Sequence, residues 1–192
     1  MLATIATVWI TGAFHEDGLA DTADGLGGGL TRERALEIMK DSRIGSYGTV
    51  ALLLALVLKV ALLALIAQRG AWPAAAALLA AHALSRLAPL VVMRSLPYVS
   101  DAAHAKAKPI AEAVTGRGFG IGCLWSIPAL ALIWQAQGAL GLIASLLLWA
   151  AALAFMLRLL RRRLQGFTGD TLGATQQVCE LALYLGFALA WP

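Results

Sequence analysis

The stretch His15–Gly48 reads HEDGLADTADGLGGGLTRERALEIMKDSRIGSYG and is flanked by strongly apolar sequence on both sides. It holds seven of the eleven acidic residues in the 192-residue chain. Polar and charged groups are costly to keep next to apolar surroundings unless they have partners. The stretch therefore predicts a binding or reaction site at the edge of a hydrophobic structure.

The rest of the chain has the composition of a membrane protein. Hydrophobic residues make up 60% of it and charged residues only 14%, whereas a soluble domain carries about a quarter charged residues. We predict an all-α polytopic membrane protein, one domain over residues 1–192, built as a bundle of five to six transmembrane helices. The candidate membrane segments are residues 49–67, 73–93 (kinked at Pro89), 119–134 and 139–157, with doubtful ones at 1–14 and at 181–191 extended back to 172.

The cations alternate between the loops that join these segments. Twelve of the fifteen Lys and Arg residues lie in the loops 15–48, 94–118 and 158–171. Because cytoplasmic loops are enriched in Lys and Arg, we expect these three loops on the cytoplasmic side of the cell inner membrane. The acidic residues lie in or beside the same loops, so the active site is expected to face the cytoplasm.

Asp17, Asp21 and Asp24 follow one another at helical spacing. On a helix they would form one acidic stripe, because residues three and four apart are neighbours on its surface. Crowded carboxylates repel one another, and an all-oxygen set of this kind suits Mg²⁺. The stripe predicts a metal site, and a solvated acidic helix face is the alternative.

The glycine run 27–29 is expected to end that helix, either as a plain terminator or as a loop that approaches a ligand. Thr31 is predicted to cap the next helix. Lys40 and Arg43 are then candidates for binding pyrophosphate oxygens, with Asp41 between them. Anchoring of the chain at the cytoplasmic surface is the alternative role for these cations.

Lys59 and Arg86 lie within predicted membrane helices. Such a charge costs about 2.5–3.5 kcal/mol on insertion scales, so each should face the bundle interior with a partner. Arg86 lies one turn from His82 and is expected to reach an anionic ligand. Asp170 brings a carboxylate from a distant part of the chain, as a phosphoryl-transfer site would need, although a turn beside a Thr171 helix cap explains it equally well.

Three motifs resemble signatures of the cobalamin synthase family, whose members are adenosylcobinamide-GDP ribazoletransferases. They are HEDGLADTADG at 15–25, MKDSRIGSYG at 39–48 and TGDTLGA at 168–174, and Ser85-Arg86 and Leu96-Pro97-Tyr98 are also similar. The resemblance covers nearly the whole chain. Family members usually begin with a further segment that includes a membrane helix, so the chain is expected to lack this N-terminal part.

The resemblance implies a Mg²⁺-dependent enzyme of the inner membrane that joins adenosylcobinamide-GDP to α-ribazole or its 5′-phosphate and releases GMP. It implies Asp17, Asp21 and Asp24 as the metal ligands. We expect the ribazole 5′-hydroxyl to attack the phosphate attached to cobinamide. The catalytic candidates are Lys40, Asp41, Arg43, Arg86 and Asp170. Membrane lipid is an expected partner, nucleic acid is not, and a homo-oligomer is left open.

Two other functions remain as alternatives. A CDP-alcohol phosphotransferase of lipid synthesis would use similar carboxylates, but it predicts an Ala-Arg pair after the first Asp-Gly, where this chain has Leu-Ala-Asp at 19–21. A divalent-cation transporter would need polar residues through the depth of the bilayer. The sequence indicates only Lys59, His82 and Arg86 there, and none of them is acidic.

Overall fold

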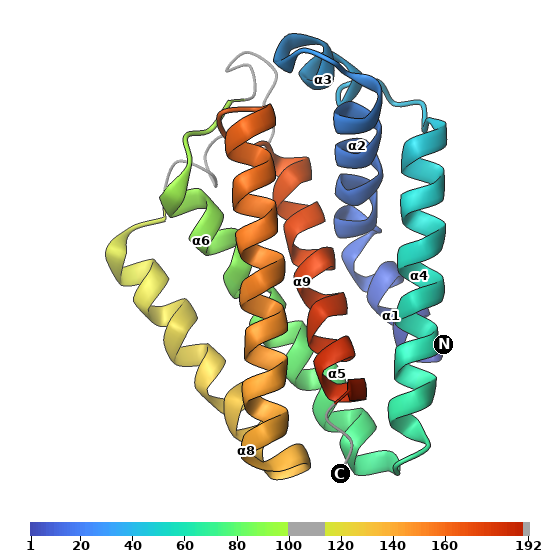
Figure 1. The fold of residues 1–192 in the computed structure, drawn as a ribbon, viewed down its shortest axis with the longest axis vertical. Helices are drawn as coiled ribbons and strands as arrows, with labels where there is room; N and C mark the ends of the chain where they lie inside the picture. Colours follow the sequence, from blue (N-terminus) through green and yellow to red (C-terminus); the bar gives the residue numbers. More distant parts are fainter. Residues whose placement is uncertain (100–113, 190–192) are drawn as a thin grey trace.

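The computed structural model describes residues 1–99 and 114–189, which form a bundle of helices (Figure 1). Within these ranges the one β-type contact is an isolated bridge between Tyr98 and Phe167. The predicted all-α class is confirmed. The helices are α1 (Leu2–Thr11), α2 (Phe14–Gly28), α3 (Arg32–Ile38), α4 (Ser46–Ala67), α5 (Ala71–Ser85), α6 (Leu87–Ser95), α8 (Gly116–Arg163) and α9 (Gly169–Leu189).

Helix α9 lies in the middle of the bundle. It packs against α2, α4, α5, α6 and α8, and Figure 1 shows it in red between the orange arm of α8 and the blue helix α2. Most of its residues are buried, including the polar side chains Gln176, Gln177 and Glu180. Because other helices surround α9, these polar groups meet protein rather than lipid.

Three of the described helical segments are long and apolar enough to cross a membrane, namely Ser46–Ala67, Ala71–Ser95 and Gly116–Arg163. The last of these is two antiparallel arms, which Figure 1 shows in yellow and orange. The chain turns between them at Gly138, where φ is 67°, a conformation that favours glycine. The predicted loop 135–138 is therefore a break at one residue, and the predicted loop residues 158–163 are helical.

The predicted segment 73–93 is divided into α5 and α6. The break falls at Arg86 rather than at Pro89. A proline ring clashes with the carbonyl group four residues earlier and removes its hydrogen bond. That carbonyl belongs to Ser85, the last residue of α5, so the proline explains a break placed before it.

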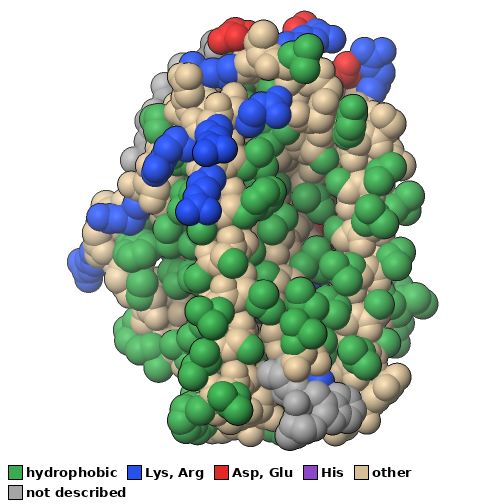
Figure 2. All heavy atoms as spheres, in the orientation of Figure 1, with side chains coloured by type: hydrophobic (Ala, Val, Ile, Leu, Met, Phe, Trp, Pro, Cys, Tyr) green, Lys and Arg blue, Asp and Glu red, His purple; other side chains and the backbone are tan. Residues whose placement is uncertain are grey.

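Charged side chains gather at the end of the bundle that carries α3, while hydrophobic side chains cover the rest of the face in Figure 2. The described parts of the three cation-rich loops meet at this polar end (Figure 1). Lys106 and Lys108, which belong to the predicted loop 94–118, lie outside the described residues, as does Trp191 of the last predicted segment.

Two arginines hold the C-terminal ends of buried helices. Arg163 donates to the carbonyl oxygens of Leu26 and Gly29 at 3.0 and 2.6 Å, at the end of α2. At the opposite end of the bundle Arg69 donates to two carbonyl oxygens at the end of α9, at 2.7 and 2.6 Å. The last carbonyl groups of a helix lack partners within it and carry a partial negative charge, so each arginine stabilises the helix end.

Candidate active site

Helix α2 carries the three predicted metal ligands. The predicted helix through Asp17, Asp21 and Asp24 is confirmed, although it runs on to Gly28 instead of ending at the start of the glycine run. Glu16 and Asp17 lie in its first turn, where acidic side chains interact favourably with the helix dipole. The three aspartates do not share one environment, because Asp17 is exposed, Asp21 is partly buried and Asp24 is buried.

Asp24 caps the N-terminus of α4 from a distant helix. Its Oδ2 accepts a hydrogen bond from the Gly45 N–H at 2.7 Å, and its Oδ1 accepts one from the Gly48 N–H at 2.8 Å. Gly45 is the N-cap residue of α4 and has no side chain to cap with. A Cβ atom on either glycine would collide with the Asp24 carboxylate. Asp24 therefore supplies the cap that the local sequence lacks.

Asp21 lies in a crowd of carboxylates from two helices. Burial, and then the charges of Asp17, Asp170 and Asp24, raise the pKa of Asp21 to about 7. Burial also raises the pKa of Asp170, against a hydrogen bond from Thr168, and the charge of Asp17 adds to the effect. Like charges held close together disfavour ionisation. The crowding shows that Asp170, from the far end of the sequence, joins the acidic stripe on α2.

Glycines bring the two carboxylate-bearing helices together. A Cβ on Gly18 would lie 2.6 Å from the carbonyl oxygen of Asp170, and a Cβ on Gly173 would lie 3.3 Å from the Cα of His15. Side chains at these positions would push α2 and α9 apart. The close approach is therefore part of what places Asp170 beside Asp17 and Asp21.

The start of α9 is held by its own threonines and by a neighbouring strand-like segment. The Thr171 N–H donates to Thr168 Oγ1 at 3.3 Å, and the Thr168 N–H donates to Thr171 Oγ1 at 2.9 Å. Because α9 begins at Gly169, Thr168 is the capping residue, and the expected cap Thr171 lies in the first turn as the second member of a reciprocal pair. The Val99 N–H donates to the Phe167 carbonyl at 3.0 Å, and the Phe167 N–H donates to Pro97 at 2.9 Å. These contacts hold Asp170 in place.

The glycines of the polar segment serve packing. A Cβ on Gly25 would lie 2.5 Å from the Met39 side chain, and one on Gly27 would lie 2.6 Å from the Tyr47 ring. They allow α3 and the start of α4 to fold back onto α2. Thr31 caps α3 as predicted, because its side chain accepts a hydrogen bond from the Arg34 N–H at 3.2 Å.

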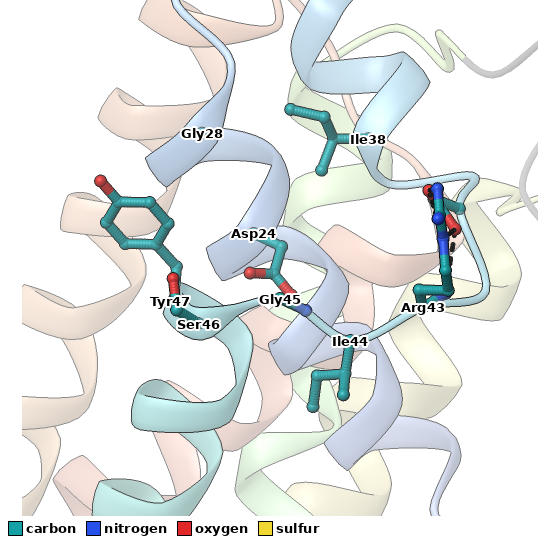
Figure 3. Close-up of a pocket in the computed structure, with 9 residues that line it drawn as sticks. Asp24, Gly28, Ile38, Arg43, Ile44, Gly45, Ser46 and Tyr47 are labelled. Atoms are coloured by element: carbon teal, nitrogen blue, oxygen red, sulfur yellow. Dashed lines mark hydrogen bonds and ion pairs between the residues drawn. The ribbon is translucent and has the colours of Figure 1, made fainter.

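A pocket of about 420 Å³ opens between the end of α2 and the segment before α4 (Figure 3). Asp24 and the N-terminus of α4 form one side of it. Helix N-termini favour anions because their N–H groups carry a partial positive charge. Two of the predicted catalytic residues, Asp41 and Arg43, also line it. The other lining residues are Gly28, Ile38, Ile44, Ser46 and Tyr47.

Asp41 and Arg43 are paired with each other in this pocket. Two hydrogen bonds of 3.0 and 2.7 Å join the guanidinium to the two carboxylate oxygens, and the Arg43 side chain is 87% exposed. The side-chain hydrogen bond from Arg43 lowers the pKa of Asp41 to about 2. A carboxylate that holds protons so weakly is a poor general base at neutral pH. Lys40 is exposed at the end of α3 and does not line the pocket.

Arg86 lies in a different place. It is exposed at the junction of α5 and α6, so the expectation that it would be buried is wrong. Its Nη1 donates to the His82 carbonyl at 2.7 Å. It lines a second pocket of about 290 Å³ with Leu87, Leu90 and Trp125, as well as Ala83, Gly122 and Ser126. Arg86 therefore does not share a pocket with Arg43.

The expected partner of Lys59 is Glu180 of α9. Their Nζ and Oε1 atoms are 2.8 Å apart, and both side chains are 1% exposed. Glu180 also accepts hydrogen bonds from Tyr184 and Gln176, both at 2.9 Å. The prediction that Lys59 faces the bundle interior with a partner is confirmed. The i, i+4 spacing of Gln176 and Glu180 in an otherwise apolar segment was the signal available in the sequence.

A second buried polar contact joins α2 to α9. Gln177 Nε2 donates to Glu16 Oε1 at 3.0 Å, and the two residues are 3% and 4% exposed. Sequence reasoning missed this pair, because Glu16 was counted with the polar segment and Gln177 with a doubtful helix. Glu16 and Glu180 also show that the buried polar groups include acidic ones.

The carboxylates fit an open Mg²⁺ site better than a closed one. Across residues 1–99 and 114–189, no three His, Cys, Asp or Glu side chains are close enough to hold a metal ion by themselves. Mg²⁺ usually keeps several waters and is held by one or two carboxylates together with substrate phosphates. The mutual crowding of Asp17, Asp21 and Asp170 supplies all-oxygen donors of that kind.

Comparison with known proteins places the chain in one family. A family model of cobalamin-5-phosphate synthase matches residues 1–188. An adenosylcobinamide-GDP ribazoletransferase of Polaromonas naphthalenivorans is 52% identical, over 98% of this chain and 72% of its own length. Enzymes of the same name from Leptothrix cholodnii and Vibrio cholerae are 51% and 43% identical, over 97% and 96% of this chain and 71% and 68% of their own lengths. No solved structure matches. The chain belongs to the cobalamin-5-phosphate synthase family.

Proposed function

We propose that the chain transfers the adenosylcobinamide phosphate group of adenosylcobinamide-GDP to α-ribazole or α-ribazole 5′-phosphate and releases GMP. This reaction belongs to the last steps of cobalamin biosynthesis. The observation that carries the proposal is the contact of Asp170 with α2 at Gly18, beside Asp17 and Asp21, at the polar end of an apolar bundle. Family membership supports the same reaction.

The attacking group is a ribose hydroxyl other than the 5′-hydroxyl. The family is named for a cobalamin 5-phosphate product, in which the 5′-oxygen of the acceptor still carries its own phosphate. The expected attack by the 5′-hydroxyl is therefore replaced. The acceptor oxygen forms a bond to the phosphorus attached to cobinamide, and the bond from that phosphorus to the bridging pyrophosphate oxygen breaks. The electron pair leaves with GMP, and the proton of the attacking hydroxyl is released to water.

One or two of the carboxylates Asp17, Asp21 and Asp170 would hold Mg²⁺ together with the substrate pyrophosphate. Bound there, Mg²⁺ would neutralise the pyrophosphate and stabilise the leaving GMP. Asp24, the third predicted ligand, has both oxygens engaged by the N-terminus of α4. We assign Asp24 to shaping the site, because an α4 that starts against α2 keeps the pocket next to the carboxylates.

Arg43 is the candidate for binding the nucleotide phosphates, because the Asp24 carboxylate already caps the N-terminus of α4. Arg43 would exchange Asp41 for a phosphate, which an exposed ion pair allows at low cost. Lys40 adds a cation nearby in the sequence. Asp41 then acts as the partner of Arg43 when no substrate is bound. Arg86 lines another pocket, and we assign it no step.

The polar end is proposed to face the cytoplasm from the inner membrane, with lipid around the apolar helices. The described parts of the cation-rich loops meet at that end (Figure 1), which is the arrangement expected for cytoplasmic loops. A cytoplasmic site also suits water-soluble, anionic nucleotide substrates.

Turnover by purified protein tests the proposal. The detergent-solubilised chain is incubated with adenosylcobinamide-GDP, α-ribazole 5′-phosphate and Mg²⁺, and GMP and the corrinoid product are separated by liquid chromatography. The double variant Asp17→Asn/Asp21→Asn should lose at least about a hundredfold in rate, since metal stabilisation supplies several kcal/mol. Glu33→Gln, an exposed acid on α3, is the matched control. No GMP from the unaltered chain with either acceptor would refute the function, and full turnover by the double variant would refute the metal assignment.

A further inference from the structure

The hydrogen bond between Glu16 and Gln177 has no part in the reaction proposed above. Both side chains are buried, at 4% and 3% exposed, and Gln177 Nε2 lies 3.0 Å from Glu16 Oε1. Among the residues that the structure describes, it is the one side-chain hydrogen bond that joins α2 directly to α9. It lies one residue before Asp17 and two helical turns after Asp170.

The Glu16–Gln177 hydrogen bond lies where it can fix the register between α2 and α9. Three contacts between α9 and α2 follow one another from the start of α9. Asp170 faces Gly18, and Gly173 faces His15. The third contact is the hydrogen bond between Gln177 and Glu16. Glycine contacts permit a close approach, but smooth surfaces of this kind can slide along each other. A directed hydrogen bond selects one register. In that register Asp170 lies against α2 at Gly18, which is next to Asp17 and three residues before Asp21.

Burying a carboxylate at the position of Glu16 costs folding free energy. Glu16 Oε2 is buried and has no hydrogen-bond partner, and a buried polar group without a partner is destabilising. An apolar side chain of similar size would pack α2 against α9 at lower cost. A polar pair here indicates a need for defined geometry rather than for stability.

We propose that Glu16 and Gln177 are positioning residues, which set the register of α2 against α9 so that Asp170 lies beside Asp17 and Asp21 at the proposed metal site. The inference rests on the proposed function. Glu16 acts through the acceptor oxygen that it presents to Gln177, and its negative charge is not required. Residues that orient metal ligands commonly change metal affinity about 10–100-fold when they are altered.

Binding of Mn²⁺ measures the effect without turnover. Mn²⁺ replaces Mg²⁺ at oxygen-rich sites. Its free concentration is read by electron paramagnetic resonance with the full chain in detergent and adenosylcobinamide-GDP but no acceptor, and the Mn²⁺ bound by adenosylcobinamide-GDP alone is subtracted. Glu16→Leu and Gln177→Leu should each weaken Mn²⁺ binding about tenfold. Glu16→Gln keeps an acceptor oxygen of the same shape, so it should retain the affinity of the unaltered chain.

Two double variants separate register from folding. Glu16→Leu/Gln177→Leu removes both polar groups and should recover thermal stability while Mn²⁺ binding stays weak. The exchange Glu16→Gln/Gln177→Glu restores a donor and an acceptor, so it should restore binding. If Glu16→Leu alone does not fold, these two variants still decide the question. Tyr184→Phe is the matched control, since it removes a buried 2.9 Å hydrogen bond within α9 that does not reach α2. It should lower stability and leave Mn²⁺ binding unchanged.

The outcomes distinguish this inference from the proposed function. Unchanged Mn²⁺ affinity in the Leu double variant overturns the positioning role and leaves the metal site standing. Loss of affinity in Glu16→Gln equal to that in Glu16→Leu overturns it as well, because the charge rather than the hydrogen bond would then be the active feature. Absence of Mn²⁺ binding by the unaltered chain overturns the metal site together with this inference.

Discussion

Two ion pairs in this molecule have nearly the same geometry and opposite surroundings. Lys59 and Glu180 are 2.8 Å apart and 1% exposed, in the middle of the bundle. Arg43 and Asp41 are 2.7 Å apart at the polar end, with side chains 87% and 39% exposed. The distances do not tell the pairs apart. Access of water does, because water screens and solvates the charges of the second pair.

The contrast assigns the two pairs different uses. Separating Asp41 from Arg43 returns both charges to water, so a phosphate can take the place of Asp41. Separating Lys59 from Glu180 leaves two charges among apolar helices, where each costs several kcal/mol. An exposed pair is therefore suited to exchange with a ligand, whereas the buried pair holds α4 against α9.

Breaking the buried pair should produce the largest effect on stability. Glu180→Leu leaves Lys59 charged and unpaired in the bundle, and it also removes the acceptor of Tyr184 and Gln176. We expect a loss of about 3–5 kcal/mol in the free energy of unfolding, measured by denaturant titration in detergent. The double variant Lys59→Leu/Glu180→Leu should recover most of that loss. Equal instability of the single and double variants would mean that the unpaired charge is not the cause.

The Asp24 cap should give an intermediate effect. Asp24→Ala leaves the Gly45 and Gly48 N–H groups without their acceptor, and the expected loss is about 1–2 kcal/mol. Asp24→Asn keeps one acceptor oxygen and should lose less. Denaturant titration gives the stability, and hydrogen exchange at residues 45–48 locates the change. Unchanged protection of these amides in Asp24→Ala would contradict the capping role.

The exposed pair should have the smallest effect on stability and a distinct effect on substrate binding. Asp41→Asn is expected to leave the unfolding midpoint unchanged, because both partners are solvated. Arg43→Ala should also leave the midpoint unchanged, while it raises the KM for adenosylcobinamide-GDP about tenfold through a lost charge-assisted hydrogen bond. Steady-state kinetics over substrate concentration makes the measurement. An unchanged KM in Arg43→Ala would remove Arg43 from the phosphate site.

The local sequence pattern is sufficient to predict much of the fold and part of the candidate site. The spacing of Asp17, Asp21 and Asp24 predicts the helix on which they lie, since helical periodicity is a property of neighbouring residues. Lys59 in an apolar run predicts a buried partner, because the cost of an unpaired charge there is known. Neither prediction needs any knowledge of which helices meet.

The environments of the same residues could not be predicted. Asp24 caps α4 and Asp170 joins Asp17 and Asp21 because of contacts between segments far apart in the chain. Arg86 is a cation in an apolar run, as Lys59 is, yet Arg86 is exposed and Lys59 is buried. Exposure depends on how α5 and α6 pack, and no repeat in the sequence encodes that.

Composition and charge pattern are enough to predict the class of the protein, the polar end of the bundle and the residues that carry its charges. Both are properties of neighbouring residues, so they do not depend on the fold. The partner that each charge meets depends on how the helices pack: Glu180 for Lys59, the N-terminus of α4 for Asp24, and Gln177 for Glu16. The acidic stripe of His15–Gly48 was visible from the start, but its completion by α9 depends on glycine contacts that form only when the two helices pack together.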